Sequence, residues 1–152
     1  MLFTKPKKAI GLDIGSHSVK AVQLGRSGGR LCVEEVGYAT VDRNMMTNDP
    51  VSAQSLAVRQ ALQPLAVKNS LLVGALPGQS VVIRYPRLPE TSKDRLAEAV
   101  YREAGQNIPY DLNEVNLDWT LLDEHLEGDK RQLRVLLVAA EHYIIENRIQ
   151  VA

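Results

Sequence analysis

The stretch GLDIGSHSVK, residues 11–20, is the part of this sequence that says most about its fold. It joins two short apolar runs, residues 9–14 and 19–24, which have the length and composition of β-strands. Only residues 15–18 separate the two runs, so we expect a tight turn between antiparallel strands. The segment therefore predicts a β-hairpin near the start of the chain.

The four turn residues have the composition of a phosphate-binding loop. Gly15 is expected to adopt a positive φ and to let a ligand approach the backbone closely. The amides of Ser16, His17 and Ser18 would then point outward together and form a nest that suits a phosphate oxygen. The two serine hydroxyls add further donors. The turn is thus a candidate anion site.

Two charged residues flank the turn, one on each strand. Asp13 ends the first strand, where its carboxylate could hold a water molecule of a hydrated Mg²⁺ ion. Lys20 lies on the second strand and could neutralise phosphate charge. The segment is neither a Walker A motif nor a G-x-G-x-x-G fingerprint. An ordinary hairpin turn that contains glycine and serine accounts for this spacing equally well.

The remainder of the first half predicts strands and one helix. A third strand is expected over residues 31–39, with a bulge or exposed edge at the adjacent glutamates 34–35. A polar segment, residues 42–50, leads into a helix over residues 51–63. A buried strand follows over residues 71–76, so the expected order is βββαβ.

The second half has the pattern βαββ and then a further helix. A strand over residues 81–84 precedes Pro86 and Pro89, which predict a rigid connector without regular pairing. A helix is expected to begin with Thr91 as N-cap of a capping box and to close at Gly105. The remaining expected elements are strands over residues 117–121 and 133–139 and a helix over residues 141–152.

Composition excludes several classes of protein. Lys plus Arg and Asp plus Glu both number 18, so the chain lacks the basic excess of a nucleic-acid binder. The single cysteine, Cys32, cannot form an intrachain disulfide. The longest apolar runs, residues 71–76 and 135–140, are too short to span a bilayer, and no secretory signal precedes the first strand. These features predict a cytoplasmic protein.

Several motifs carry a family resemblance. GLDIGSHSVKAVQL, residues 11–24, resembles the first phosphate loop of the actin, hexokinase and Hsp70 superfamily. YPRLPE at 85–90, AVYREAGQNIPYDLNEVNLDW at 99–119 and VLLVAAE at 135–141 resemble the PilM family, the actin-like component of type IV pilus assembly. The motifs occur in the family's order over nearly the whole chain. The resemblance implies an α/β fold of the actin-like (ribonuclease H-like) type.

The family's architecture predicts three regions. Residues 1–77 would form part of subdomain 1A, residues 78–140 an inserted small βαββ subdomain 1C, and residues 141–152 the start of a helix that returns to 1A. Family members are substantially longer, so the second lobe, with its second phosphate loop and adenosine pocket, is absent. We therefore expect this chain to bind ATP weakly or not at all.

The resemblance also implies site residues and a cofactor, ATP with Mg²⁺. His17 departs from the small residues usual at its position, but a backbone amide does the binding there. Asp13 would contact Mg²⁺ through water, and no catalytic residue is implied. The implied nucleotide-binding residues are Asp13, Gly15, Ser16, His17, Ser18 and Lys20.

The implied function is scaffolding rather than catalysis. The family docks the cytoplasmic N-terminal peptide of a PilN-type membrane protein and meets other pilus platform proteins at the cytoplasmic face of the inner membrane, which it reaches through its partners. Nucleic acid is not an expected partner. The alternatives are a kinase-type enzyme of the same superfamily, an FtsA-like division scaffold and a type II secretion scaffold. A kinase would need a positioned catalytic carboxylate, which the sequence does not reveal.

Overall fold

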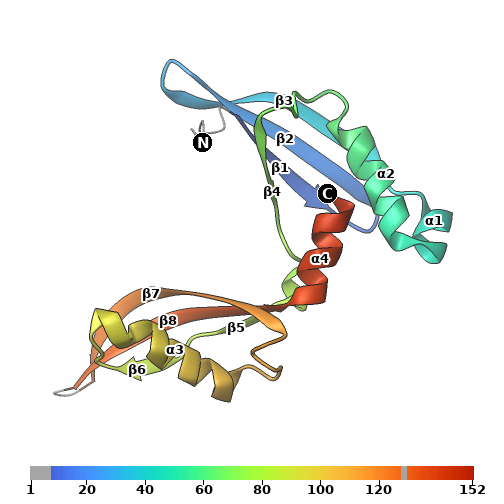
Figure 1. Ribbon diagram of the computed structural model, residues 1–152. Helices are drawn as coiled ribbons and strands as arrows, with labels where there is room; N and C mark the ends of the chain where they lie inside the picture. Colours follow the sequence, from blue (N-terminus) through green and yellow to red (C-terminus); the bar gives the residue numbers. More distant parts are fainter. Residues whose placement is uncertain (1–7, 128–129) are drawn as a thin grey trace, which may run out of the picture. The chain divides into compact units, whose positions relative to one another are not determined.

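The computed structural model describes residues 8–127 and 130–152 and divides them into two compact units (Figure 1). The first unit comprises the described residues up to Ala75 together with Asn147–Ala152, and the second comprises Leu76–Glu146. Each unit has its own four-stranded sheet and its own apolar core. The assignment of these units to subdomains 1A and 1C stays a prediction.

The sheet of the first unit begins with the expected hairpin. β1 (Lys8–Ile14), β2 (Ser18–Ser27) and β3 (Arg30–Thr40) form an antiparallel meander. β4 (Ser70–Gly74) pairs in parallel with β1, giving the order β3-β2-β1-β4. The strands expected from the apolar runs of the first half are therefore confirmed, and β1 and β4 end at the same edge of the sheet.

The expected bulge in β3 is also present, and its Glu34 side chain joins a polar network around the buried Gln23. The β2–β3 register shifts so that Glu34 is left without a partner in the ladder. Gln23, which is 2% exposed, donates from Nε2 to Glu34 Oε2 (2.7 Å) and accepts from the Ala66 amide at Oε1 (2.8 Å). Lys8 Nζ lies 2.6 Å from the same glutamate oxygen.

Hydrogen bonds from Lys8 and then from Gln23 hold the pKa of Glu34 below its ordinary range. A carboxyl group with a lowered pKa in the folded state stabilises the fold above its pKa in the unfolded chain, and this stabilisation is lost as the pH falls through the lowered value. The contribution of Glu34 to the stability of the fold is therefore lost only at acidic pH.

Two helices lie between β3 and β4. α2 (Pro50–Leu62) confirms the expected helix, and it is preceded by α1 (Arg43–Asn48), which the polar sequence did not predict. Each begins at an aspartate, Asp42 or Asp49, whose carboxylate accepts from the amide three residues later. Hydrogen bonds from Ser52 lower the pKa of Asp49. The two caps explain how a polar segment forms helix here.

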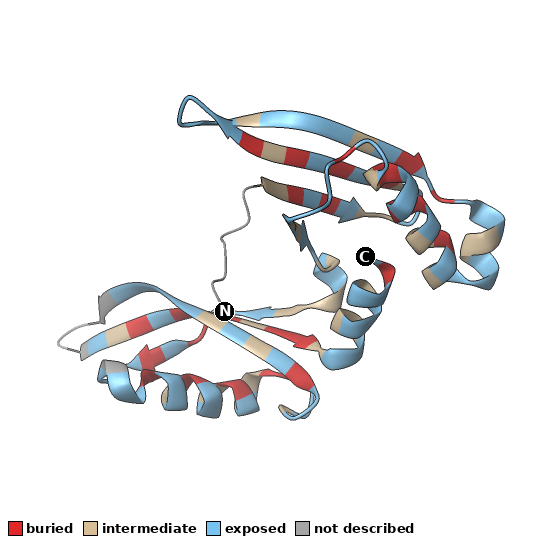
Figure 2. Cartoon of the chain, turned by 45° about the horizontal axis from the view of Figure 1, so that its top comes forward, coloured by how far each residue is buried: buried red, intermediate tan, exposed pale blue. Residues whose placement is uncertain are grey.

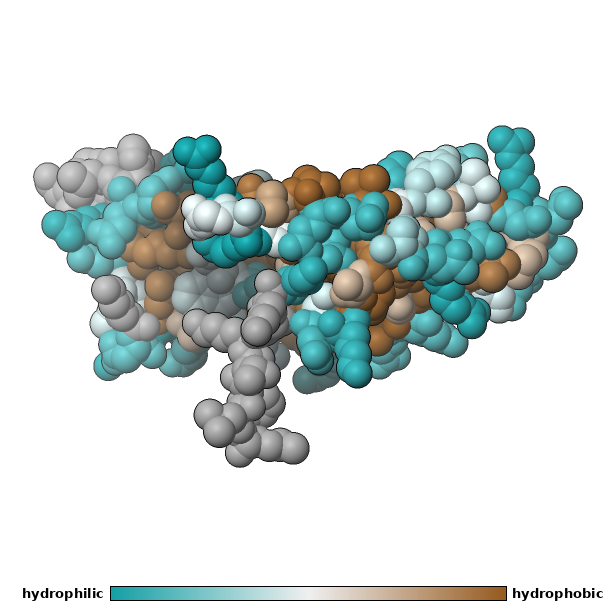
Figure 3. All heavy atoms as spheres, turned by 90° about the horizontal axis from the view of Figure 1, so that it is seen from above, coloured by the Kyte–Doolittle hydropathy of each residue, from teal (hydrophilic) through white to brown (hydrophobic). Residues whose placement is uncertain are grey.

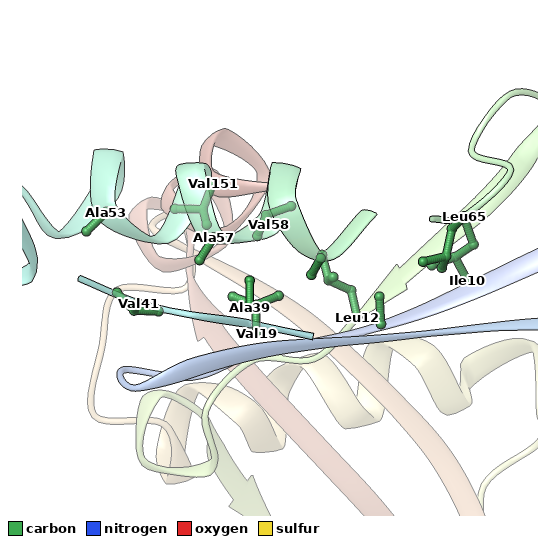
Figure 4. Packing of buried hydrophobic residues seen from close by; sticks show 12 residues of the cluster. Ile10, Leu12, Val19, Ala39, Val41, Ala53, Ala57, Val58, Leu65 and Val151 are labelled. Atoms are coloured by element: carbon green, nitrogen blue, oxygen red, sulfur yellow. The ribbon is translucent and has the colours of Figure 1, made fainter. Parts of the chain in front are cut away.

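The core of the first unit lies between α2 and one face of its sheet (Figure 4). α2 presents small side chains to the sheet, and Val151 of α4 (His142–Val151) joins the same cluster. Gly37 of β3 lies so close below α2 that a Cβ atom there would overlap the Ala61 carbonyl group. The buried residues of α2 are Ala53, Ala57, Val58 and Ala61.

The opposite face of this sheet is apolar as well, although it is exposed. Buried and exposed residues alternate along the strands (Figure 2), and apolar side chains reach the molecular surface among polar ones (Figure 3). The register brings several of the exposed apolar residues together on the strands of this sheet. These residues are Val22, Val36, Tyr38, Leu71 and Val73.

β8 (Lys130–Glu141) is the centre of the second unit. β7 (Val115–Glu127) pairs along one side of it, and β5 (Val82–Arg84) and β6 (Arg87–Pro89) pair with its other side, all antiparallel. α3 (Lys93–Asn107) packs on the sheet through Leu96, Val100 and Ala104. A short 3₁₀ turn, η1 (Gly78–Ser80), precedes β5. β7 and β8 are longer than the apolar runs indicated.

The expectation that Pro86 and Pro89 prevent pairing is wrong. β5 and β6 keep one register along β8, so they form a single edge strand that is interrupted only at Tyr85 and Pro86. The Pro86 carbonyl accepts from the Val135 amide (3.1 Å), but its nitrogen has no hydrogen to return. Because neighbouring residues alternate in direction, the nitrogen of Pro89 faces outward, where the loss costs no ladder bond.

The expected ends of α3 also need correction. Ser92, rather than Thr91, is the N-cap, and its side chain makes no capping hydrogen bond, so the capping box is absent. The Thr91 hydroxyl instead donates to the Pro89 carbonyl (2.8 Å). The helix continues past Gly105 to Asn107, because the Ile108 amide still donates to the Ala104 carbonyl (2.8 Å).

Candidate functional site

The turn between β1 and β2 brings together the residues that the sequence singled out. Asp13 and Lys20 face each other across the hairpin, and Lys20 Nζ lies 3.0 Å from Asp13 Oδ2. Both side chains are largely exposed, so the pair contributes little to stability. Its importance is electrostatic, because the lysine charge beside the turn is already balanced by a carboxylate.

Gly15 has a different role from the one expected. In the described part of the chain the glycines with positive φ are Gly28 and Gly29, and Gly15 is not among them. A Cβ atom at Gly15 would lie 3.0 Å from the Ser18 carbonyl oxygen and 4.0 Å from the amide nitrogens of His17 and Ser18. The glycine is required for space rather than for a left-handed backbone.

The carbonyl groups of Ile14, Gly15, His17 and Ser18 all accept hydrogen bonds within the first unit. The Gly15 amide closes the turn on the Ser18 carbonyl (3.0 Å). Three further contacts hold the neighbouring carbonyls, and two of their donors are side chains from distant parts of the sequence. Ile14 accepts from Arg148 Nη1 (3.2 Å), Gly15 from Gln54 Nε2 (3.1 Å) and His17 from the Val41 amide (2.9 Å).

The amides of Ser16 and His17 are left without an acceptor among the described residues. Both residues are exposed, and the Ser16 hydroxyl pairs with His17 Nδ1 (2.8 Å), where the tautomer decides which group donates. With the Gly15, His17 and Ser18 carbonyls already bonded, the exposed backbone of the turn offers two amide donors beside the open space at Gly15. This arrangement suits an anion such as a phosphate group.

The turn suits the phosphate groups of the implied cofactor better than it suits the Mg²⁺ ion. The free amides and the space at Gly15 suit a phosphate group. Residues 8–127 and 130–152 contain no group of three or more His, Cys, Asp or Glu side chains placed to hold a metal ion. Asp13 is paired with Lys20, so its contact with Mg²⁺ stays a prediction.

Sequence reasoning missed Gln54 and Arg148. They lie 39 and 134 residues along the chain from the carbonyls that they bond, and neither belongs to a recognisable motif. Gln54 could have been found only by placing α2 on the sheet, and Arg148 only by placing α4. Their contribution to the site therefore follows from tertiary packing.

The second unit has two surface hollows that contain none of the predicted site residues. One, of about 390 Å³, is lined by Arg87, Asp123, Glu124, Gln132 and Arg134, and an Arg134–Asp123 ion pair of 2.6 Å crosses it. The other, of about 480 Å³, lies beside α3 and β6. Across the described ranges, no helix has both the length and the apolar character needed to cross a bilayer.

Comparisons with known proteins point to one family. The family model described as type IV pilus assembly protein PilM matches residues 11–152. A solved chain from a PilM-PilN type IV pilus biogenesis complex is 23% identical, with a TM-score of 0.77 and coverage of 97% of this chain and 44% of that one.

A second solved structure is more distant. It is the cytoplasmic domain of EpsL, an inner membrane component of the type II secretion system of Vibrio cholerae, and it is 9% identical with a TM-score of 0.53. The match covers 95% of this chain and 51% of the EpsL chain. At such identities the two likenesses show a shared mixed α/β fold. The chain spans about half the length of the solved chains that it matches.

Proposed function

This chain belongs to the family of the type IV pilus assembly protein PilM, and on that basis we propose that it is part of an actin-like, nucleotide-binding scaffold for pilus assembly. In this proposal the two units are the first lobe of an actin-like (ribonuclease H-like) fold, with an inserted small subdomain. The family match over residues 11–152 and the structural likeness to a chain of a PilM-PilN complex support this proposal.

The observation that carries the nucleotide-binding role is the hydrogen bonding of the β1–β2 turn. The carbonyls of Ile14, Gly15 and His17 all accept hydrogen bonds, while the amides of Ser16 and His17 have no acceptor within the part of the chain that the structure describes. ATP with Mg²⁺ would place a phosphate against these amides, with the Ser18 hydroxyl and Lys20 beside it. These residues would bind and orient the phosphate chain, and the metal would offset its remaining charge.

The proposed role is binding without turnover. Asp13, the carboxylate nearest the turn, pairs with Lys20, which supports an electrostatic role rather than that of a general base. A scaffold needs its nucleotide to stabilise one arrangement of its parts, and a bound phosphate can do this without being transferred.

The proposed partner is the N-terminal peptide of a PilN-type membrane protein. The solved chain that this one resembles comes from a PilM-PilN type IV pilus biogenesis complex, which supports this choice. The protein would then work at the cytoplasmic face of the inner membrane, attached through its partners and beside other platform proteins. The likeness to EpsL makes a type II secretion scaffold the second candidate, but that likeness reflects the fold alone.

Titration with tripolyphosphate tests the phosphate site. We expect the backbone amide signals of Ser16 and His17 to move most in ¹H–¹⁵N NMR spectra, with a Kd of about 1 mM, because few groups contact the anion. ATP with Mg²⁺ should bind these 152 residues no more tightly than tripolyphosphate, since we expect the adenosine pocket of this family to lie in a second lobe outside them. Unmoved Ser16 and His17 signals would rule out a phosphate site at this turn. A micromolar affinity for ATP would contradict the expectation that these residues bind only its phosphate groups.

Titration with a synthetic PilN-type N-terminal peptide tests the docking role. We expect saturable one-to-one binding by calorimetry, and no binding of a peptide of the same composition in scrambled order. NMR spectra of the same sample would establish that the chain is folded. Absence of binding by a folded chain would contradict docking by this part of the protein.

A further inference from the structure

Arg148 brings a positive charge to the β1–β2 turn, and the site described so far gives this charge no role. It lies near the end of α4, is half-buried, and donates from Nη1 to the Ile14 carbonyl (3.2 Å). Within residues 8–127 and 130–152 no carboxylate pairs with it. A guanidinium group has five N–H donors, so most of its donors remain available.

Arg148 lies at the edge of the sheet where a ligand is expected to bind. Ile14 is the last residue of β1, and β4, which is parallel to β1, ends at the same edge of the sheet. In sheets with parallel strands, ligands bind outside the carboxyl ends of the strands. The bond to the Ile14 carbonyl therefore places a cation beside the residue that opens the candidate phosphate turn.

The turn itself supplies little net positive charge to a phosphate group that binds without a metal ion. Lys20 is paired with Asp13 at 3.0 Å, so the predicted phosphate lysine adds no net charge. The free amides of Ser16 and His17 supply only partial charges. A phosphate group bound there would be left with most of its negative charge uncompensated, unless another positive group is near.

We propose that Arg148 is a phosphate-binding residue of this site, which it completes from the far end of the chain. One edge of its planar guanidinium is fixed by the Ile14 carbonyl, and the remaining N–H groups supply charge-assisted hydrogen bonds to the anion. Packing of Val151 in the core of the first unit fixes this end of α4. Gln54 has a supporting role, because it holds the Gly15 carbonyl away from the ligand. This inference rests on the proposed nucleotide-binding function.

The test compares tripolyphosphate binding by the wild-type chain and by Arg148→Gln, with the amide signals of Ser16 and His17 as the readout. Loss of a charge-assisted contact should weaken binding by about tenfold or more, and Arg148→Lys should retain part of the affinity. The matched control is Arg26→Gln. It removes the same charge near the opposite end of β2, where no partner within the described residues is lost.

A second control separates charge from helix position. Val151→Ala loosens the same end of α4 without removing a cation, and it should weaken binding at most about twofold. Equal affinity of Arg148→Gln and wild type overturns the inference, as does an equal loss in Arg26→Gln or in Val151→Ala. In each of these cases wild-type binding leaves the proposed function intact. If tripolyphosphate moves no signal of Ser16 or His17 in the wild type, the proposed function fails and the role of Arg148 fails with it.

Discussion

Replacement of Gly37 by alanine is expected to destabilise the first unit by about 3 kcal/mol. The new methyl group would overlap the Ala61 carbonyl and approach Leu65 Cδ1 to 2.9 Å. Ala61 contributes a backbone atom of α2, which cannot rotate away as a side chain would. The helix would have to lift from the sheet, and the small side chains beneath it would lose their packing.

Urea unfolding followed by the amide signals of β3 would measure this loss as a lower midpoint with an unchanged slope. Gly74→Ala is the matched control, since a Cβ atom there meets only the Leu12 carbonyl oxygen, at 3.9 Å. We expect that control to lie within about 0.5 kcal/mol of the wild type. A similarly small effect of Gly37→Ala would show that α2 does not rest directly on β3.

The largest expected effect on binding comes from Gly15→Ala. The added methyl group would lie 4.0 Å from the amide nitrogens of His17 and Ser18, in the space through which a phosphate oxygen must approach. Tripolyphosphate binding should fall by at least about a hundredfold, because the oxygen loses several hydrogen bonds at once. The contact of 3.0 Å with the Ser18 carbonyl should cost at most about 1 kcal/mol of stability.

Gly11→Ala provides the comparison for this variant. Gly11 lies on β1, the strand that leads into the turn, and a Cβ atom there meets nothing within 4 Å. That variant should bind tripolyphosphate as the wild type does. Retained binding by Gly15→Ala, measured in the same NMR titration, would mean that the anion does not approach over Gly15 and that the turn is an ordinary hairpin.

Local patterns predicted most of the secondary structure, because they depend on neighbouring residues alone. The apolar runs identified β1, β2 and β4, and the paired glutamates predicted the bulge at Glu34. α1 was missed since its sequence is polar and its formation depends on the Asp42 cap. β6 was missed because the effect of Pro89 depends on which way its nitrogen faces, and β8 decides that.

The candidate site could be predicted only in part for the same reason. The motif around Gly15 identified the turn and its donors, and the motifs at 85–90, 99–119 and 135–141 identified the family. The expected positive φ of Gly15 was wrong, and the short distance between this residue and the Ser18 carbonyl cannot be read from the sequence. The contacts of Arg148 and Gln54 with the turn could not be predicted, since only the packing of α2 and α4 brings these residues there.

The edge strand formed by β5 and β6 also bears on how copies of this protein avoid joining one another. A strand from a second molecule extends a sheet by bonding the outward-facing amides and carbonyls of its edge. At Pro89 the outward nitrogen has no hydrogen, and the carbonyl already accepts from the Thr91 hydroxyl. An added strand would find no backbone donor and no unbonded carbonyl at Pro89. Strand pairing along this edge, and amyloid-like growth from it, would therefore stop after a few residues.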